Sequence, residues 1–247
     1  FMHLHLGLAG VLALGVAAGV RTRLCALGFA LLFTYAELID ATVYLNHYYL
    51  VSLLALLLAV VPSGGTLTFG KGGACVPAWA YLVFRAQVGV VYIFAGLAKL
   101  DGDWLLRGEP LYTWLQAHAE LPLVGPWLAT KSAALLMSFA GALFDLGIVP
   151  ALLWKRTRRQ AYVVAVIFHL SVWALFPVGM FSFIMLASAT LFFAPEWPRR
   201  WLSHVVPRLQ GPLLSRAGLV VLTLYVVLQV ALPLRFLLYP GEVNWHE

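Results

Sequence analysis

Apolar runs long enough, or nearly long enough, to cross a membrane recur along the whole chain. A transmembrane helix needs about 20 predominantly apolar residues. In a bilayer the backbone N–H and C=O groups of such a run must be bonded within the protein, as they are in an α-helix. The sequence therefore predicts an all-α, polytopic transmembrane helical bundle of about eight spans, forming one domain over residues 1–247. The runs fall at about 4–20, 24–43, 47–62, 78–100, 131–154, 161–176, 180–194 and 217–238.

The composition excludes a soluble monomer and a nucleic-acid-binding protein. Hydrophobic residues make up 62% of the chain and charged residues only 11%, whereas an ordinary soluble domain carries roughly 25% charged residues. The net charge of +6 comes from short basic clusters between the apolar runs, which is typical of topology signals. Membrane lipid is thus the expected surrounding, and no nucleic acid is expected as a partner.

The basic residues also orient the bundle, because Lys and Arg are enriched in cytoplasmic loops. Eleven of the sixteen basic residues lie in alternate loops, after the first, third, fifth and seventh runs. Both ends of the chain are therefore expected on the exoplasmic side. We also expect further protein on that side beyond Glu247.

Ionisable and amide side chains gather near the predicted exoplasmic ends of the runs. A charged side chain in a bilayer costs at least about 2.5–3.5 kcal/mol, so each one invites a functional hypothesis. Glu37, Asp40 and Tyr44 share one helix face by their spacing. The whole group comprises Glu37, Asp40, Tyr44, Asn46, His47, Lys99, Asp101, Asp103 and, within the sixth run, His169.

Lys99 is the candidate general base of this group. Its neighbours Ala98 and Leu100 are apolar, and desolvation favours the neutral amine, whereas a carboxylate such as Asp101 favours the ammonium. A neutral amine can accept a proton from a ligand. The competing interpretation is a lysine that extends to the membrane surface. For the histidines at 47 and 169, the competing interpretation is a hydrogen-bonded structural role.

Two other features predict packing rather than chemistry. Arg85 and Asp145 lie at comparable depths in their runs, so an ion pair between them is expected to join these helices. Residues 103 to about 121 mix aromatic residues and leucines with charges, which is typical of an amphipathic helix in the membrane interface. This helix either covers a cavity that opens to lipid or anchors the chain.

Four stretches of the sequence resemble one known family. They are LNHYYL at 45–50, YIFAGLAKLDGDW at 92–104, the FH pair at 168–169 and PVGMFSFIMLASATLFFAPEWPRR at 177–200. In this order they resemble the vitamin K-dependent γ-glutamyl carboxylases and their bacterial relatives, which share a membrane domain called HTTM. The resemblance covers most of residues 40–200.

The resemblance implies a membrane carboxylase. Such an enzyme couples oxidation of a reduced vitamin K or menaquinol-like quinone by O2 to γ-carboxylation of glutamate with CO2. Lys99 is implied as the base that deprotonates the quinol, and Asn46 and His47 as the residues that stabilise developing oxygen anions. No metal is implied, and the sequence shows no metal-binding constellation. The residues implied to contact the quinone are His169, Tyr44, Asp101, Trp104, Met180 and Phe181.

The resemblance also implies partners and a location. The partners are a lipid quinone and a glutamate-containing protein or peptide on the exoplasmic side, which the active site faces. The location is the inner or cell membrane of a bacterium, or the endoplasmic reticulum of a eukaryote. Animal members have two adjacent lysines where this chain has Ala98 and Lys99. They also continue into a large exoplasmic region after the last helices, so we expect this chain to be a fragment that lacks it.

Two other functions stay open. One is a non-enzymatic HTTM protein, an interaction or secretion partner in which the polar cluster is structural. The other is a quinone-binding oxidoreductase or transporter that moves protons through Glu37 and Asp40. A quinol-sized cavity beside Lys99 favours the carboxylase, a cavity filled by side chains favours the second function, and a water wire from Glu37 favours the third.

Overall fold

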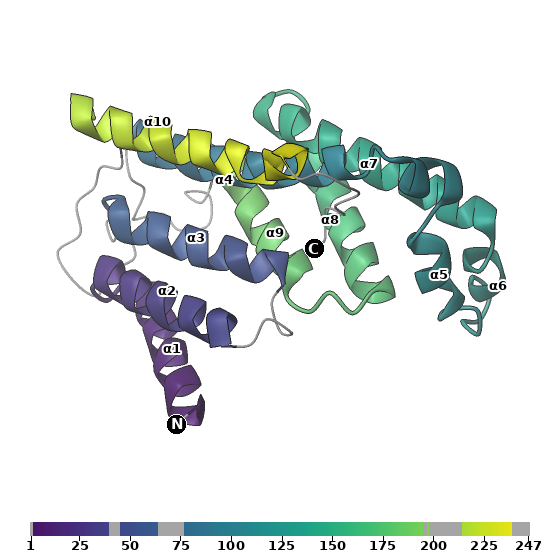
Figure 1. Cartoon of the computed structure of the whole chain (residues 1–247), viewed down its shortest axis with the longest axis horizontal. Coiled ribbons are helices and arrows are strands. Elements are labelled where there is room, and N and C mark those ends of the chain that lie inside the picture. The colour runs from purple at the N-terminus through teal and green to yellow at the C-terminus, as the bar shows by residue number, and fades with distance from the viewer. Residues whose placement is uncertain (1, 40–44, 64–76, 195–196, 198–213, 239–247) are drawn as a thin grey trace. The chain divides into compact units, whose positions relative to one another are not determined.

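Every regular element in the described part of the chain is a helix (Figure 1). The structure, a computed structural model, describes residues 2–39, 45–63, 77–194, 197 and 214–238. The all-α fold predicted from the apolar runs is confirmed for these residues. The longer helices are α1 (Met2–Ala17), α2 (Thr22–Ile39), α3 (Asn46–Val60), α4 (Ala78–Ala98), α7 (Lys131–Leu153), α8 (Arg158–Leu175), α9 (Phe181–Ala189) and α10 (Arg216–Ala231). The shorter pieces are a π-helical turn η2 (Asp103–Arg107), α5 (Leu111–Gln116), α6 (Gly125–Leu128) and the 3-10 turns η3 (Thr190–Phe192) and η5 (Pro233–Leu238).

Three helices of the described residues are long and apolar enough to cross a membrane. They are α2, α4 and α7. The apolar helices α1, α3 and α10, and α9 together with η3, are shorter. Each predicted run thus coincides with a helix, and the structure is compatible with an integral membrane protein. The count of about eight spans, and with it the orientation, stays a prediction.

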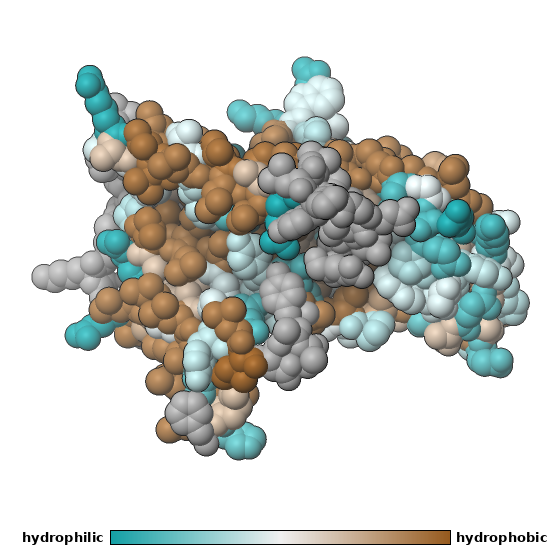
Figure 2. Space-filling view, in the orientation of Figure 1, coloured by the Kyte–Doolittle hydropathy of each residue, from teal (hydrophilic) through white to brown (hydrophobic). Residues whose placement is uncertain are grey.

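Apolar side chains cover much of the outer surface of the helices. Figure 2 shows them as broad brown areas, with hydrophilic residues gathered over the α5 and α6 segment and at helix ends. Leu143 of α7 is 75% exposed, and Leu224 of α10 is 62% exposed. Exposed apolar surface on this scale suits contact with lipid chains rather than water.

The contacts divide the chain into two compact units. Unit 1 comprises residues 1–85 and 193–222, and unit 2 comprises residues 86–192 and 223–247. In unit 1, α2 packs against α1 on one side and against α3 on the other (Figure 1). Small residues permit this packing, because Ala26 and Ala30 are buried and a Cβ on Gly15 would lie 2.8 Å from the Sγ of Cys25.

In unit 2, α7 has neighbours along its whole length. Its first turns pack against η2, α5 and α6, and α8 packs along it. The hydroxyl of Thr130 caps its start by accepting a hydrogen bond from the backbone N–H of Ala133 at 3.2 Å, as N-cap residues do. A turn in which Gly179 has a φ of +55° separates α8 from α9.

The prediction of a single interfacial helix over residues 103 to about 121 is wrong, because the segment is not one continuous helix. The segment folds as η2 and α5, separated by Gly108 at a φ of +73° and by Pro110, because a residue with positive φ and a residue without an N–H both interrupt a helix. Leu111 and Leu115 of α5 are buried with Leu128 and Ala134. Leu123, by contrast, is 98% exposed. Residues 103–128, which comprise η2, α5 and α6, therefore form a cap of short helices on the start of α7, and the exposed Leu123 is available to the membrane interface.

Gly96 permits a close approach between α4 and α7. A Cβ at this position would lie 2.7 Å from the side chain of Leu146 and 3.0 Å from its backbone nitrogen. We expect Gly96→Leu to destabilise the protein by roughly 1–3 kcal/mol, because extra atoms in a packed interface force the helices apart. Gly147→Leu is the matched control, since a Cβ there meets nothing within 4 Å. Thermal unfolding in detergent micelles, followed by tryptophan fluorescence, measures both. Equal melting temperatures for the two variants would contradict this account of the interface.

Candidate functional site

Lys99 and Asp145 form a partly buried ion pair within unit 2. Lys99 directly follows α4, and Asp145 lies on α7, where its apolar neighbours exclude water. The Nζ atom of Lys99 lies 2.7 Å from Oδ2 of Asp145 and donates a second hydrogen bond, of 3.1 Å, to the carbonyl oxygen of Ala95. The Lys99 side chain is 21% exposed and that of Asp145 is 8% exposed. The amine is thus open on one side, whereas the carboxylate is enclosed.

Trp104 holds this amine from another direction. Its ring centroid lies 5.1 Å from Nζ of Lys99, a cation–π contact worth about 0.5–2 kcal/mol. The indole N–H donates to the carbonyl oxygen of Ser138 at 2.9 Å, and the backbone N–H of Trp104 donates to Oδ1 of Asp101 at 2.7 Å. The structure therefore brings together three of the predicted site residues, Lys99, Trp104 and Asp101, and Asp101 contacts the backbone of Trp104.

Asp145 is the residue of this site that the sequence interpretation placed elsewhere. It was predicted to pair with Arg85, but the ion pair that the structure describes for it is with Lys99. Arg85 belongs to unit 1. There its guanidinium donates to the carbonyl oxygen of Phe193 at 2.9 Å and lies 4.8 Å from the ring centroid of Tyr81. Gly96, one helical turn before Lys99, is the sequence signal that marks this end of α4 as a close helix contact.

His169 is enclosed by aromatic side chains and hydrogen-bonded to Tyr92. Its Nε2 atom lies 2.9 Å from the Tyr92 hydroxyl, and only 1% of the residue is exposed. The rings of Phe144, Phe168 and Phe181 lie with their centroids 5.4–5.7 Å from that of His169. Among the described residues, Nδ1 of His169 has no hydrogen-bond partner. His169 is thus a buried histidine whose hydrogen bond to Tyr92 joins two helices, as the structural interpretation of this residue predicts.

The predicted quinone contacts at the start of α9 differ in exposure. Met180 directly precedes α9 and is 60% exposed. Phe181, the first residue of the helix, packs instead against His169. Their predicted contact with a quinone stays a prediction.

Asn46 and His47 form the first turn of α3 in unit 1. Asn46 is exposed, and His47 is buried with its ring centroid 4.6 Å from that of Tyr48. The predicted approach of Lys99 to these two residues would join unit 2 to unit 1, and it stays a prediction. Tyr44 lies outside the described residues.

Glu37 has a partner that the sequence interpretation did not name. Its Oε2 atom accepts a hydrogen bond of 2.8 Å from the Ser52 hydroxyl, which in turn accepts one of 3.1 Å from Thr34. The bonds join α2 to α3 within the helix pair. Asp40, the other half of the predicted acidic pair, lies outside the described residues.

Among the described residues no group of three His, Cys, Asp or Glu side chains is placed to hold a metal ion.

The comparison with known proteins identifies a domain family. No solved structure gives a significant match to the chain. The HTTM domain family matches residues 1–197, a range that includes Asn46, His47, Lys99 and Asp145. This match extends over well more than half of the 247 residues, and the chain therefore belongs to the HTTM domain family.

Proposed function

We propose that the chain is a membrane carboxylase that couples oxidation of a reduced vitamin K-type quinone by O2 to γ-carboxylation of glutamate with CO2. The observation that carries the proposal is the partly exposed Lys99 amine, held 2.7 Å from the buried Asp145 carboxylate in a chain of the HTTM family. The chemistry supplied by a bound reduced quinone is the reduction of O2, which drives removal of the glutamate γ-proton. The donor set fits such a ligand, because a quinol hydroxyl needs a base that is reachable from one side.

Asp145 gives Lys99 a way to become that base. A lysine accepts a proton only as the neutral amine. Through the existing hydrogen bond the ammonium proton can pass to Asp145, leaving an amine beside a carboxylic acid in the same geometry. When a bound ligand displaces water from the site, the loss of hydration raises the cost of both charges and so favours this neutral arrangement. The pair can then take a ligand proton at Nζ of Lys99 without a change of fold.

Other residues position and shield the amine. Trp104 covers one side of it, and its bond to Ser138 fixes the indole against α7. The short helices of the 103–128 cap pack around the start of the same helix. Exclusion of water strengthens the electrostatic interactions inside such a site. Asn46 and His47, whose side chains carry N–H donors, are proposed to stabilise developing oxygen anions.

A second candidate function is that of a non-enzymatic HTTM protein. The observation that favours it is the number of partners already around Lys99. Its amine contacts Asp145, the carbonyl oxygen of Ala95 and the Trp104 ring. These contacts stabilise the packing of α4 against α7 in a protein with or without catalytic activity.

An activity assay of the complete protein in lipid nanodiscs separates the two functions. With reduced vitamin K or a reduced menaquinone, O2, labelled CO2 and a glutamate-containing peptide, we expect quinone epoxide and labelled carboxyglutamate to form together. Samples without the reduced quinone, or without O2, are the controls and should yield neither product. A folded protein that forms no epoxide with either quinone would support the non-enzymatic function.

A further inference from the structure

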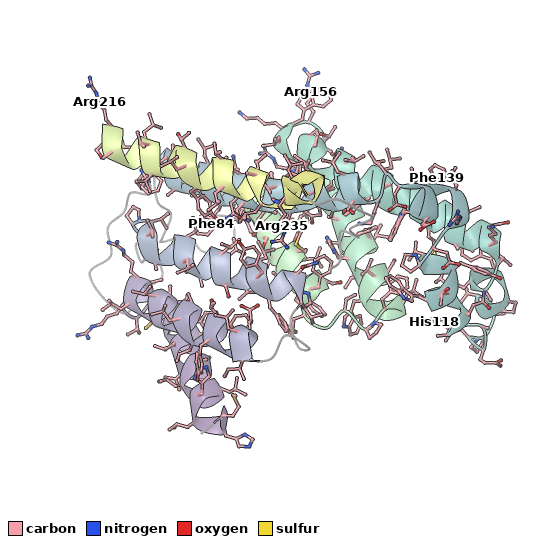
Figure 3. All side chains as sticks on the ribbon, viewed as in Figure 1. Phe84, His118, Phe139, Arg156, Arg216 and Arg235 are labelled. Atoms are coloured by element: carbon pink, nitrogen blue, oxygen red, sulfur yellow. The ribbon has the colours of Figure 1, made fainter. Side chains whose placement is uncertain are left out.

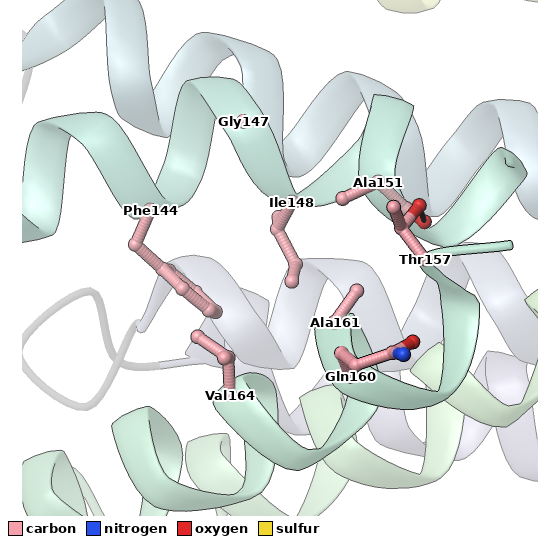
Figure 4. A pocket seen from close by; sticks show the side chains of 8 residues that line it. All are labelled: Phe144, Gly147, Ile148, Ala151, Thr157, Gln160, Ala161 and Val164. Carbon is pink, nitrogen blue, oxygen red and sulfur yellow. Dashed lines mark hydrogen bonds between the residues drawn. The ribbon is translucent and has the colours of Figure 1, made fainter.

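A hollow lies between α7 and α8, and neither Lys99 nor Asp145 lines it. Figure 4 shows it between Phe144 and Ile148 of α7 and Ala161 and Val164 of α8. Its volume is about 290 Å³, just below the range of roughly 300–1,000 Å³ that is usual for ligand pockets. Along α7 it extends from Phe144 to Ala151, which is about 10 Å of helix. It is therefore large enough for a narrow ligand and too small for another helix.

The hollow is lined almost entirely by hydrocarbon groups. Its lining is nearly all apolar atoms, and it is open at the surface. The hydroxyl of Thr157, one of its two polar lining residues, donates to the carbonyl oxygen of Ala151 at 2.8 Å. A ligand inside thus finds few groups with which to form hydrogen bonds. The part of a ligand that fits is a flexible hydrocarbon chain.

The α7–α8 loop and the first turn of α8, at the mouth of the hollow, carry four cations in the five residues 155–159. Arg158 is committed to the fold, because its guanidinium donates to the carbonyl oxygens of Leu152 and Leu153 at 2.8 and 2.9 Å. Lys155, Arg156 and Arg159 are exposed, and no ion pair is described for them in the part of the chain that the structure covers. We call these three residues the basic mouth. Figure 3 shows the side chain of Arg156 extending outward from the loop.

We propose that the hollow binds one acyl chain of an anionic phospholipid whose phosphate lies on the basic mouth. Cations beside apolar surface at a helix end match an anionic lipid headgroup above its hydrocarbon chain. Trp154 adjoins the mouth and is 59% exposed, a position that tryptophans prefer at the level of lipid headgroups. A neutral lipid would leave the three cations without a counter-charge. A quinone ring would find few polar partners in the hollow.

The charge at the mouth is tested by a triple substitution, Lys155→Gln with Arg156→Gln and Arg159→Gln. Native mass spectrometry of the complete protein, titrated with phosphatidylglycerol or phosphatidylcholine, measures the affinity for each lipid. Each basic residue at a lipid headgroup contributes about fivefold in affinity, so the loss for phosphatidylglycerol should be on the order of a hundredfold. The matched control removes three other exposed cations, Arg21, Lys131 and Arg216, and should retain wild-type affinity.

The hollow itself is tested by Gly147→Leu. A Cβ at Gly147 meets nothing within 4 Å, so leucine fills the space without disturbing α7. We expect phosphatidylglycerol affinity to fall about tenfold or more with no loss of melting temperature. Gly10→Leu is the matched control, because Gly10 also lies in a helix with open space around it.

Three results of the lipid titrations would overturn the proposal. They are equal affinity of the wild-type protein for the two lipids, undiminished phosphatidylglycerol binding by the triple variant, and undiminished binding by Gly147→Leu. A vitamin K-type quinone that displaces phosphatidylglycerol in a one-to-one manner would likewise assign the hollow to a different ligand. Free glycerol phosphate should not compete, since the acyl chain provides the contact with the hollow.

Discussion

Replacing Asp145 with leucine is expected to lower the free energy of unfolding by about 3 kcal/mol. The substitution leaves the Lys99 amine in an apolar environment without its carboxylate, which lies 2.7 Å away and is 8% exposed in the native protein. Removing one partner of a buried ion pair costs about 3–5 kcal/mol, and an isolated charge in a membrane costs at least about 2.5–3.5 kcal/mol. Denaturant unfolding in mixed micelles, followed by tryptophan fluorescence, measures the change.

The double variant Lys99→Met with Asp145→Leu should recover most of this loss. It removes both charges together, and apolar replacements of similar volume for a buried pair are often neutral or stabilising. The matched control is the pair Arg107–Asp103, which has the same 2.7 Å separation but side chains that are 74% and 67% exposed. Asp103→Leu should cost only about 0.3–0.5 kcal/mol. If the double variant is no more stable than Asp145→Leu, the unpaired charge of Lys99 is not the cause of the lost stability.

The helices themselves were predictable from the sequence, because long apolar runs leave the backbone few alternatives. The start of α7 after Thr130 and the helix that ends before Lys99 both lie where the apolar runs predict them. The number of spans did not follow from the apolar runs alone, because several of the helices they form are too short to cross a membrane. Only α2, α4 and α7 among the described helices have both the length and the hydropathy that crossing requires.

The partner of Asp145 was not predictable from depth along the runs. The prediction that Arg85 pairs with Asp145 assumes that α4 and α7 lie side by side along their whole lengths. In the structure, the first turns of α7 pack against η2, α5 and α6, so the end of α4 meets α7 near Leu146 instead. Asp145 therefore reaches Lys99. The cap that sets where α4 contacts α7 was itself predicted as one helix. The hydrophobic periodicity of the segment gives no sign of the interruption at Gly108 and Pro110.

The predicted site residues separate into those that share unit 2 and those that do not. Lys99, Asp101 and Trp104 adjoin one another in sequence, and their proximity follows from the chain itself. His169 came from an isolated FH pair, and its hydrogen bond to Tyr92 required knowledge of which helices pack together. Ser52 as the partner of Glu37 was unpredictable for a related reason, because a serine in an apolar run gives no periodic signal.

Substituting Lys99 with arginine should abolish quinone epoxidation while retaining the fold. An arginine keeps the positive charge opposite Asp145 and the cation–π contact with Trp104, but its guanidinium does not give up its proton in proteins. The catalytic proposal needs a neutral base at this position. We therefore expect epoxide formation to fall by about 10²–10⁴-fold, the usual contribution of a general base, with a melting temperature close to that of the wild-type protein.

Lys99→Ala completes this comparison, because it removes the base and the ion pair together. It should lose as much activity as Lys99→Arg and, in addition, a large part of the stability that Asp145→Leu loses. Arg107→Ala, which removes an exposed cation of the cap, should keep both activity and stability. Full epoxide formation by Lys99→Arg would mean that the charge at Lys99 is needed only to hold α4 against α7, and the base would have to be sought elsewhere. Loss of activity in a stable Lys99→Arg protein separates the chemistry from the packing, since the two variants differ in charge and agree only in lacking an amine that can lose its proton.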